Sequence, residues 1–257
     1  MPEPRSRDSN EPVTIRRMNP EISGIGERLD HIRERIERAA VRSGRSADDV
    51  TIVGVSKTFS ADRIAEAYAG GIRHFGENRV QEWEAKRSTL ADLDAVWHLV
   101  GHLQSNKAAR AVKLFHCVDS LDSLDLAQRL DHAFASRAEA SPGKRIRVLI
   151  EVRVDPTPTK SGASAEELPA ILDRMLTLPR LEVKGLMGVP PMGDPERVRS
   201  AFCRLRELRD AAEHRSGISL PVLSMGMSSD FEVAVEEGAT EIRIGTALFG
   251  AREAKPA

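Results

Sequence analysis

The sequence predicts an α/β fold, a single (β/α)₈ barrel of the TIM type with an extra helix before its first strand. Its length of 257 residues is close to the ~250 residues typical of one such barrel. Eight short apolar segments alternate with segments of helical periodicity, and no long linker separates them. An open, doubly wound sheet is the alternative that this pattern leaves open.

The ordered domain is expected over residues 20–257, after a disordered tail at 1–19. The tail mixes proline, arginine, serine and acidic residues and lacks the apolar segment of a signal peptide. A helix from about Ile22 to Ser43 should follow and form a cap or lid on the barrel, because apolar residues recur there at spacings of three and four. This apolar stripe comprises Ile22, Ile25, Leu29, Ile32, Ile36 and Ala39.

The strands are expected where aliphatic residues form short runs between turn residues. The first run, Val50–Val55, is β-branched and almost entirely apolar, as is typical of a strand buried on both faces. In a parallel barrel the carboxyl ends of all strands meet at one rim, where ligands bind. The expected strands span residues 50–55, 72–75, 96–100, 114–118, 146–154, 181–187, 222–224 and 241–244.

The helices between these strands are predicted from their capping residues and apolar stripes. Ser60 is suited to cap the helix 61–69, and Asp194 followed by Pro195 marks the start of the helix 195–214. The remaining helices are expected at 78–90, 105–112, 123–138, 164–177 and 230–237, with a helical turn at 246–251.

Composition excludes several classes of function. The formal net charge of -1 gives no basic field for nucleic acid or acidic lipid, and an aromatic content of 4% argues against base-stacking surfaces. No stretch approaches 18 apolar residues, so we expect no membrane span. The two cysteines, Cys117 and Cys203, follow no metal spacing and are expected to be reduced core residues in a cytoplasmic protein.

Lys57 follows the first strand and would lie at the ligand-binding rim of the barrel. Burying a charged lysine there is costly, so one interpretation is a functional amine with a lowered pKa. The other is a side chain that leaves the core and reaches water. Position and composition alone do not separate the two.

The loops after the last two strands predict a phosphate site. Ser224–Asp230 is rich in small residues that let backbone N–H groups approach an anion, and Arg243–Thr246 follows on the next strand. Loops after strands seven and eight commonly bind phosphate in such barrels. The alternative is two ordinary turns in which Ser228 only caps a helix.

An amine and a phosphate site on neighbouring strands suggest a phosphorylated aldehyde held as a Schiff base. Pyridoxal 5′-phosphate (PLP) is the obvious candidate, and Arg243 would then reach its ring. Asn78, at the end of the second strand, could form a hydrogen bond to the same ring. His98 and His102 invite a metal interpretation, but no third ligand has a compatible local spacing, so we expect histidines that pack or form hydrogen bonds and no metal site.

Together these segments resemble the pyridoxal phosphate homeostasis protein family (the YggS/PROSC group), whose fold is that of the alanine racemase N-terminal domain. The resemblance covers residues 22–252 in order and with the right spacing. The matching segments are Val55–Thr58, Gly76–Asn78, Trp97–Lys107, Lys160–Gly162, Gly185–Met187, Met225–Ser228 and Arg243–Thr246.

The resemblance implies a role for each candidate residue. It places Lys57 at the PLP aldehyde, Ser228, Gly245 and Thr246 at the phosphate, Arg243 at the pyridine nitrogen, and Asn78 on the side of the ring hydroxyl. It also implies an intracellular role in PLP (vitamin B6) homeostasis without robust catalysis, with PLP-dependent apo-enzymes as possible partners.

An amino-acid racemase is the rival interpretation, because it would share the barrel, the lysine and the phosphate site. Two-base racemisation needs a second acid or base on the opposite face, supplied in alanine racemase by a tyrosine from an extra β-domain. The only tyrosine, Tyr68, falls in the helix after the first strand, where we expect it to pack. Without the dimerising domain we expect a monomer. A barrel enzyme for another phosphorylated carbonyl compound is a third possibility.

Overall fold

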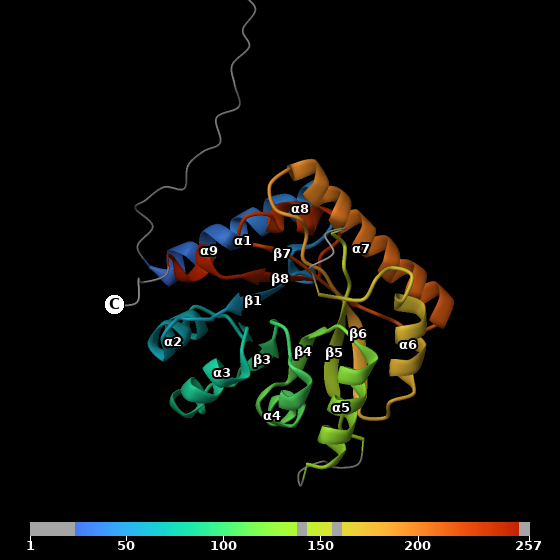
Figure 1. Ribbon diagram of the computed structural model, residues 1–257. Helices are drawn as coiled ribbons and strands as arrows, with labels where there is room; N and C mark the ends of the chain where they lie inside the picture. The colour runs from blue at the N-terminus through green and yellow to red at the C-terminus, as the bar shows by residue number, and fades with distance from the viewer. Residues whose placement is uncertain (1–23, 138–142, 156–160, 252–257) are drawn as a thin grey trace, which may run out of the picture.

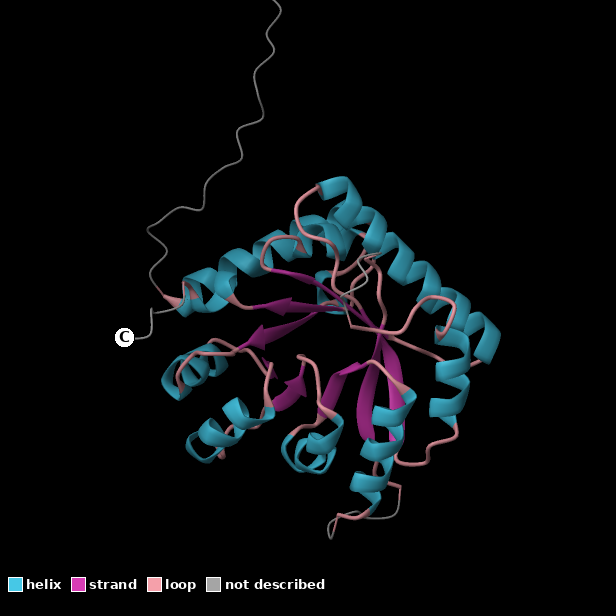
Figure 2. Cartoon of the chain, in the orientation of Figure 1, coloured by secondary structure: helices cyan, strands magenta, loops and turns pink. Residues whose placement is uncertain are grey.

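The computed structural model describes residues 24–137, 143–155 and 161–251, which form a closed eight-stranded barrel surrounded by helices (Figures 1 and 2). All neighbouring strands pair in parallel, and β1 pairs with β8 to close the barrel, which excludes the open sheet. The predicted tail at 1–19 lies outside the described residues. The strands are β1 Thr51–Val55, β2 His74–Glu77, β3 Val96–Leu99, β4 Cys117–Leu121, β5 Ile146–Glu151, β6 Leu181–Met187, β7 Val222–Met227 and β8 Glu241–Ile244.

The helices follow the predicted order along the chain. Ser60 accepts a hydrogen bond from the Arg63 N–H at the start of the second helix, and Asp194 caps the seventh, as expected. The helices are α1 Ile25–Arg42, α2 Ala61–Ala69, α3 Val80–Lys86, α4 Ala108–Leu114, α5 Leu124–Ala135, α6 Leu168–Leu176, α7 Pro195–Ser216, α8 Phe231–Glu236 and α9 Thr246–Phe249, with 3₁₀ turns at Ala47–Asp49, Arg87–Leu90 and Ser105–Lys107.

Two strands were predicted too early in the chain. β2 begins at His74 rather than at residue 72, and β4 begins at Cys117 rather than at residue 114. Both strands contain buried polar residues, Glu77 at the end of β2 and Asp119 with Ser120 within β4. The search for apolar runs missed them because their polar side chains are buried and paired rather than exposed.

The first helix is part of the outer ring of helices and is not a lid. α1 packs against α8 and α9 and also contacts α2, so it covers the seam between β8 and β1 (Figure 1). Its buried stripe, which includes Leu29, Ile32 and Ile36, joins the main core. The helix that follows β8, α9, has only four residues, and α1 supplies the apolar cover that this short helix cannot give.

The barrel has an apolar layer outside its strands and a polar interior. Between strands and helices, the rings of Trp83 and Trp97 stack with centroids 3.7 Å apart, and Phe75 stacks on Trp97 at 5.2 Å. His98 on β3 and Glu241 on β8 lie in the interior, where His98 Nδ1 is 4.0 Å from Glu241 Oε2. These two strands are not neighbours, so their side chains meet only across the interior.

Cys117 is buried in β4 and Cys203 is half-buried in α7, and both are free thiols. The expectation of reduced cysteines is therefore confirmed, although Cys203 is only half-buried. Among the helices that the structure describes, none combines the length and apolar character needed to cross a bilayer.

Candidate functional site

The predicted site residues occupy four consecutive strands of the barrel. Lys57 follows β1, Asn78 follows β2, and Ser228 follows β7, while Gly245 and Thr246 follow β8. Arg243 lies within β8 itself. Because β7, β8, β1 and β2 are neighbours in the closed barrel, these residues share one arc of the carboxyl-terminal rim.

Ser228 links the two loops that were predicted to bind phosphate. Its hydroxyl oxygen accepts hydrogen bonds from the N–H groups of Gly245, at 3.3 Å, and Ala247, at 3.2 Å. A serine oxygen that accepts two N–H groups can still donate its own hydrogen, which is then available to an anion. Ser228 does not hold the N-cap position of α8, which Asp230 occupies, but its two hydrogen bonds are to N–H groups at the start of α9.

Gly245 leaves open space beside these donors. Its φ of -104° suits any residue, so backbone conformation does not require a glycine here. A Cβ atom added at Gly245 would meet only Val55, at 3.7 Å from its carbonyl oxygen, which is an ordinary contact. Ser228, Gly245 and the exposed Thr246 therefore lie together at the ends of β7 and β8, and a side-chain carbon at Gly245 would meet no atom closer than 3.7 Å.

Arg243 is buried and held by two hydrogen bonds. Its guanidinium donates from Nη1 to the Ser224 hydroxyl at 2.7 Å and from Nη2 to the Gly188 carbonyl at 2.9 Å. These bonds use two of its five N–H donors. Burial lowers the pKa of Arg243, while Glu241 and Asp119 raise it through their negative charge. The interactions fix a cation beneath the rim.

Lys57 stands in a loop that is anchored from behind. Lys86 on α3 donates to the backbone carbonyl of Ser56 at 3.1 Å and pairs with the Glu77 carboxylate at 2.6 Å. The Ser56 hydroxyl donates to the same carboxylate at 2.7 Å. Burial raises the pKa of Glu77, and Lys86 and Ser56 offset that effect in part. Thr58, directly after Lys57, has a φ of +69°, so this turn is held in an uncommon conformation.

Asn78 is half-buried, and its backbone is packed against the loop after β3. A Cβ atom at Gly101 would come within 2.4 Å of the Asn78 carbonyl oxygen, so this approach requires glycine. Ser120 secures the same loop by donating to the Gly101 carbonyl at 2.7 Å. The Gly101 contact explains why Asn78 has a fixed position at the rim.

The opposite side of the rim carries polar residues that sequence reasoning missed. Glu151 ends β5 and accepts a hydrogen bond from the Ser161 hydroxyl at 2.7 Å. Burial raises the pKa of this carboxyl, Ser161 and Arg243 lower it, and Asp122 raises it further. Asp122 in turn contacts His102 Nδ1 at 3.1 Å. The only sequence signal for Glu151 is a polar residue at the end of an apolar strand.

A second polar cluster fills the interior around His98. Its Nδ1 lies 2.8 Å from the Asp119 carboxylate, and its Nε2 lies 3.0 Å from His74 Nδ1. Burial lowers the pKa of His98, but the carboxylate of Asp119, contact with the Cys117 thiol and the charge of Glu241 together hold it well above the usual value. Burial and the neighbouring His98 lower the pKa of His74 to about 4.

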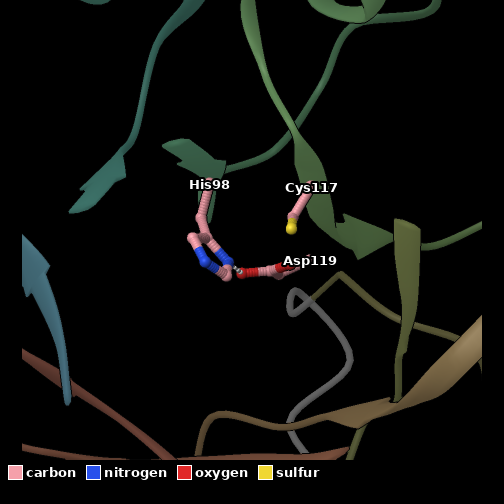
Figure 3. Close-up of side chains that lie close together, drawn as sticks. All are labelled: His98, Cys117 and Asp119. Atoms are coloured by element: carbon pink, nitrogen blue, oxygen red, sulfur yellow. Dashed lines mark hydrogen bonds and ion pairs between the residues drawn. The ribbon is translucent and has the colours of Figure 1, made fainter. Parts of the chain in front are cut away.

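His98 and His102 both form hydrogen bonds, as expected, but His98 also has ligand-type neighbours that local spacing did not reveal. Cys117 and Asp119, on the neighbouring strand β4, bring a sulfur and a carboxylate oxygen within 4.8 Å of it (Figure 3). The sequence search considered only local spacing, whereas these groups meet across a strand pair. His102 remains outside this cluster, exposed and paired with Asp122.

Tyr68 lies in α2, where the Arg73 guanidinium stacks over its ring at 4.1 Å, so its packing role is confirmed. It does not face the rim from the side opposite Lys57. One arc of the rim thus carries the amine of Lys57, the hydroxyl of Ser228 and the buried guanidinium of Arg243. The carboxyl group of Glu151 lies on β5.

Comparison with known proteins gives family matches that cover most of this chain. The profile of the alanine racemase N-terminal domain family matches residues 28–253. The pyridoxal phosphate homeostasis protein of Aquifex aeolicus is 44% identical over 229 residues, which cover 88% of this chain and 98% of that protein. The protein of the same name from Pseudomonas aeruginosa is 42% identical and covers 90% of this chain and 97% of its own length.

Solved structures give the same result. PipY of Synechococcus elongatus, solved with PLP bound, is 39% identical and superposes with a TM-score of 0.76 over 88% of this chain and 100% of its own. Alanine racemase from Corynebacterium glutamicum has a TM-score of 0.61 but is only 18% identical, and the match covers 87% of this chain and 61% of the racemase. That likeness shows the shared fold alone. This chain belongs to the pyridoxal phosphate homeostasis protein family.

Proposed function

We propose that this chain binds PLP, holds it as a Schiff base on Lys57 without robust catalysis, and serves PLP homeostasis. The observation that carries the proposal is the arc formed by β7, β8 and β1. It brings Lys57, the hydrogen-bonded pair Ser228 and Gly245, and the Arg243 guanidinium to one rim. PLP supplies an aldehyde, a phosphate and a pyridine nitrogen, and this arc offers a group suited to each.

Each residue has a distinct proposed task. The amine of Lys57 takes the aldehyde, and the Ser228 hydroxyl and the exposed Thr246 donate to the phosphate, for which Gly245 leaves room. Arg243 directs a cation at the pyridine nitrogen, and Asn78 hydrogen-bonds on the side of the ring hydroxyl. A guanidinium keeps that nitrogen unprotonated, which weakens the electron sink that catalysis on PLP requires. The proposed chemistry is therefore capture and release.

Racemisation is the competing function, and the fold that this chain shares with alanine racemase keeps it testable. The relatives above 35% identity that are described here carry names of homeostasis proteins rather than of racemases. Glu151 is the described carboxyl group on the opposite side of the rim, but Ser161 already holds it by a hydrogen bond. We therefore propose a carrier rather than a racemase.

We also propose that the protein is cytoplasmic and monomeric and hands PLP to apo-enzymes. The two free thiols support a reducing compartment. Large apolar side chains exposed on the described surface are few, which supports a monomer. They are Val41 on α1, Leu176 on α6, and Val189 and Met192 in the loop between β6 and α7. The exposed position of Thr246 supports transfer, because it leaves the proposed phosphate site open to solvent.

The test is to trap PLP on the full-length protein. Borohydride reduction followed by peptide mass spectrometry should find the phosphopyridoxyl group on Lys57. The visible absorbance should be abolished in Lys57→Ala and retained in the control Lys113→Ala, a lysine on α4. A label on another residue, or a different phosphorylated carbonyl compound in the native mass spectrum, would contradict the assignment. Lys57-dependent racemisation of a free amino acid at an enzymatic rate would contradict the carrier role.

A further inference from the structure

The interior cluster around His98 brings three ligand-type side chains together near a buried carboxylate oxygen that has no hydrogen-bond partner among the described residues. His98, Cys117 and Asp119 are all buried, and their donor atoms lie within 4.8 Å of one another (Figure 3). Glu241 extends toward this group from β8, with its Oε2 4.0 Å from His98 Nδ1. Its other oxygen, Oε1, is buried and has no hydrogen-bond partner among the described residues. Buried carboxylates normally are paired or coordinate metals.

We propose that His98, Cys117, Asp119 and Glu241 form a tetrahedral site for one divalent transition metal of the zinc type. The site lies inside the barrel, next to the proposed PLP arc, and shares none of its four ligands with that arc. Imidazole, thiolate and carboxylate are the three ligand types that Zn²⁺ takes in proteins. Zinc–ligand bonds of about 2.0–2.3 Å place tetrahedral ligands about 3.3–3.8 Å apart. The donor atoms of His98, Cys117 and Asp119, which lie within 4.8 Å of one another, therefore close by about 1 Å on binding, and Glu241, which lies outside that group, moves toward them from β8.

The residue that contacts the outer nitrogen of His98 also fits a metal site. A metal-bound histidine usually donates its other ring N–H to a fixed acceptor. If His98 coordinates through Nδ1, its Nε2–H points at His74 Nδ1, which lies 3.0 Å away. This contact fixes the ring and its tautomer. The unsatisfied Glu241 oxygen gains a partner when the metal is bound.

Charge is balanced when the metal is present. A thiolate and two carboxylates with a divalent cation carry a net charge of -1, and Arg243, two residues from Glu241 on the same side of β8, contributes +1. Binding requires the thiolate of Cys117 and the neutral imidazole of His98, so each releases the proton it carries to solvent. Because the ligands are buried, we expect the metal to enter while the chain folds.

Cobalt gives a direct test, because it replaces zinc and reports a thiolate ligand by a charge-transfer band in the near ultraviolet. The full-length protein is produced in medium containing Co²⁺, and its metal content and spectrum are measured after removal of PLP. We expect one Co²⁺ per chain, the charge-transfer band, and the visible bands of a tetrahedral ion. Added Zn²⁺ during refolding should replace the cobalt and abolish both signals.

The two cysteines supply a matched pair of variants. Cys117→Ser should abolish the charge-transfer band, whereas Cys203→Ser should leave it unchanged, because Cys203 contacts Glu237, directly after α8, and not the cluster. Asp119→Asn should lower the metal content at least fivefold. Far-ultraviolet circular dichroism and PLP binding report folding in each variant. Wild-type protein that takes up no Co²⁺, or a band that survives Cys117→Ser, overturns the metal site and leaves the proposed PLP function unaffected.

Discussion

The ammonium group of Lys86 donates a hydrogen bond to the backbone carbonyl of Ser56, the residue directly before Lys57. The same ammonium lies 3.4 Å from the Phe59 carbonyl, on the other side of Lys57, so it connects both ends of the turn. Its ion pair with Glu77 fixes its own position. Lys86 therefore acts as a brace for the turn that carries the proposed PLP lysine.

Replacing Lys86 by methionine should weaken both the fold and PLP retention. The variant leaves the fully buried Glu77 carboxylate without its cation, which should cost about 3 kcal/mol of unfolding free energy. Urea unfolding measures this loss. The double variant Lys86→Met with Glu77→Gln should regain most of the stability, since no unpaired charge remains, but should still release PLP faster than wild type. Equal PLP release from the double variant and wild type would contradict the brace.

The proposed phosphate site can be tested by adding a methyl group at Gly245. Gly245→Ala should change the unfolding free energy by less than about 0.5 kcal/mol, because the added methyl group meets only ordinary contacts. The same methyl group should weaken PLP binding at least about tenfold, or about 1.4 kcal/mol, by intruding where the phosphate binds. Absorbance titrations measure the effect. Pyridoxal, which lacks the phosphate, is the control ligand, and an equal loss of its binding would place the steric conflict elsewhere.

Ser224 should matter through Arg243. Ser224→Ala leaves a guanidinium donor at Nη1 buried without an acceptor, which should cost about 1–2 kcal/mol of unfolding free energy. A less firmly held guanidinium should also lower the affinity for PLP several-fold. Urea unfolding and PLP titration give the two values. Ser216→Ala, which removes a half-buried hydroxyl at the end of α7, serves as the control and should leave PLP affinity unchanged.

An ion cluster should make stability fall in acid. Arg199 on α7 pairs with Glu236 and Glu237, and Arg42 on α1 pairs with Glu236. Burial alone raises the pKa of both glutamates, but the hydrogen bonds to Arg199 and their other partners outweigh it, so both pKa values lie below 4.5. A carboxyl group with a lowered pKa stabilises the fold above its unfolded value and loses that contribution as the pH falls through its folded value.

The pH-dependent contribution can be isolated with Arg199→Met. At about pH 7 this variant should lose about 1 kcal/mol, a modest value because Arg199 is 39% exposed and water screens its charge. The difference from wild type should shrink as the pH is lowered below about 4.5, where the glutamates of both proteins become protonated. Urea unfolding across that range measures it. A difference that stays constant with pH would assign the effect to packing.

The fold could be predicted from sequence where local chemistry and tertiary environment agree. β6 was located correctly because apolar residues alternate with polar ones from Leu181 and the strand ends in Leu186 and Met187. α7 was located correctly because Asp194 and Pro195 mark its first turn. β4 was misplaced because its central residues, Asp119 and Ser120, are polar yet buried. Polarity usually indicates exposure, so a polar barrel interior defeats that rule.

The candidate site could likewise be predicted only in part. Lys57, Ser228 and Gly245 could be selected because each follows a strand, and parallel strands end at one rim. The cluster of Cys117 with His98 could not, since the two residues meet through the pairing of β3 with β4. The register of that pairing is set by the closed barrel rather than by any local spacing. Lys86 was missed because its contacts with Ser56 and Glu77 also arise from the tertiary fold and not from a local spacing.

The position of α1 has a consequence for synthesis on the ribosome. Arg35 on α1 pairs with Glu232 on α8, 197 residues later in the chain. At about 5–20 residues per second, the first helix waits about 10–40 s before the surface it packs against has been made. During that interval its apolar stripe lacks its native partners on α8 and α9, and the barrel cannot close. Nascent chains of this protein should therefore depend on chaperone binding to α1 until β8 is released.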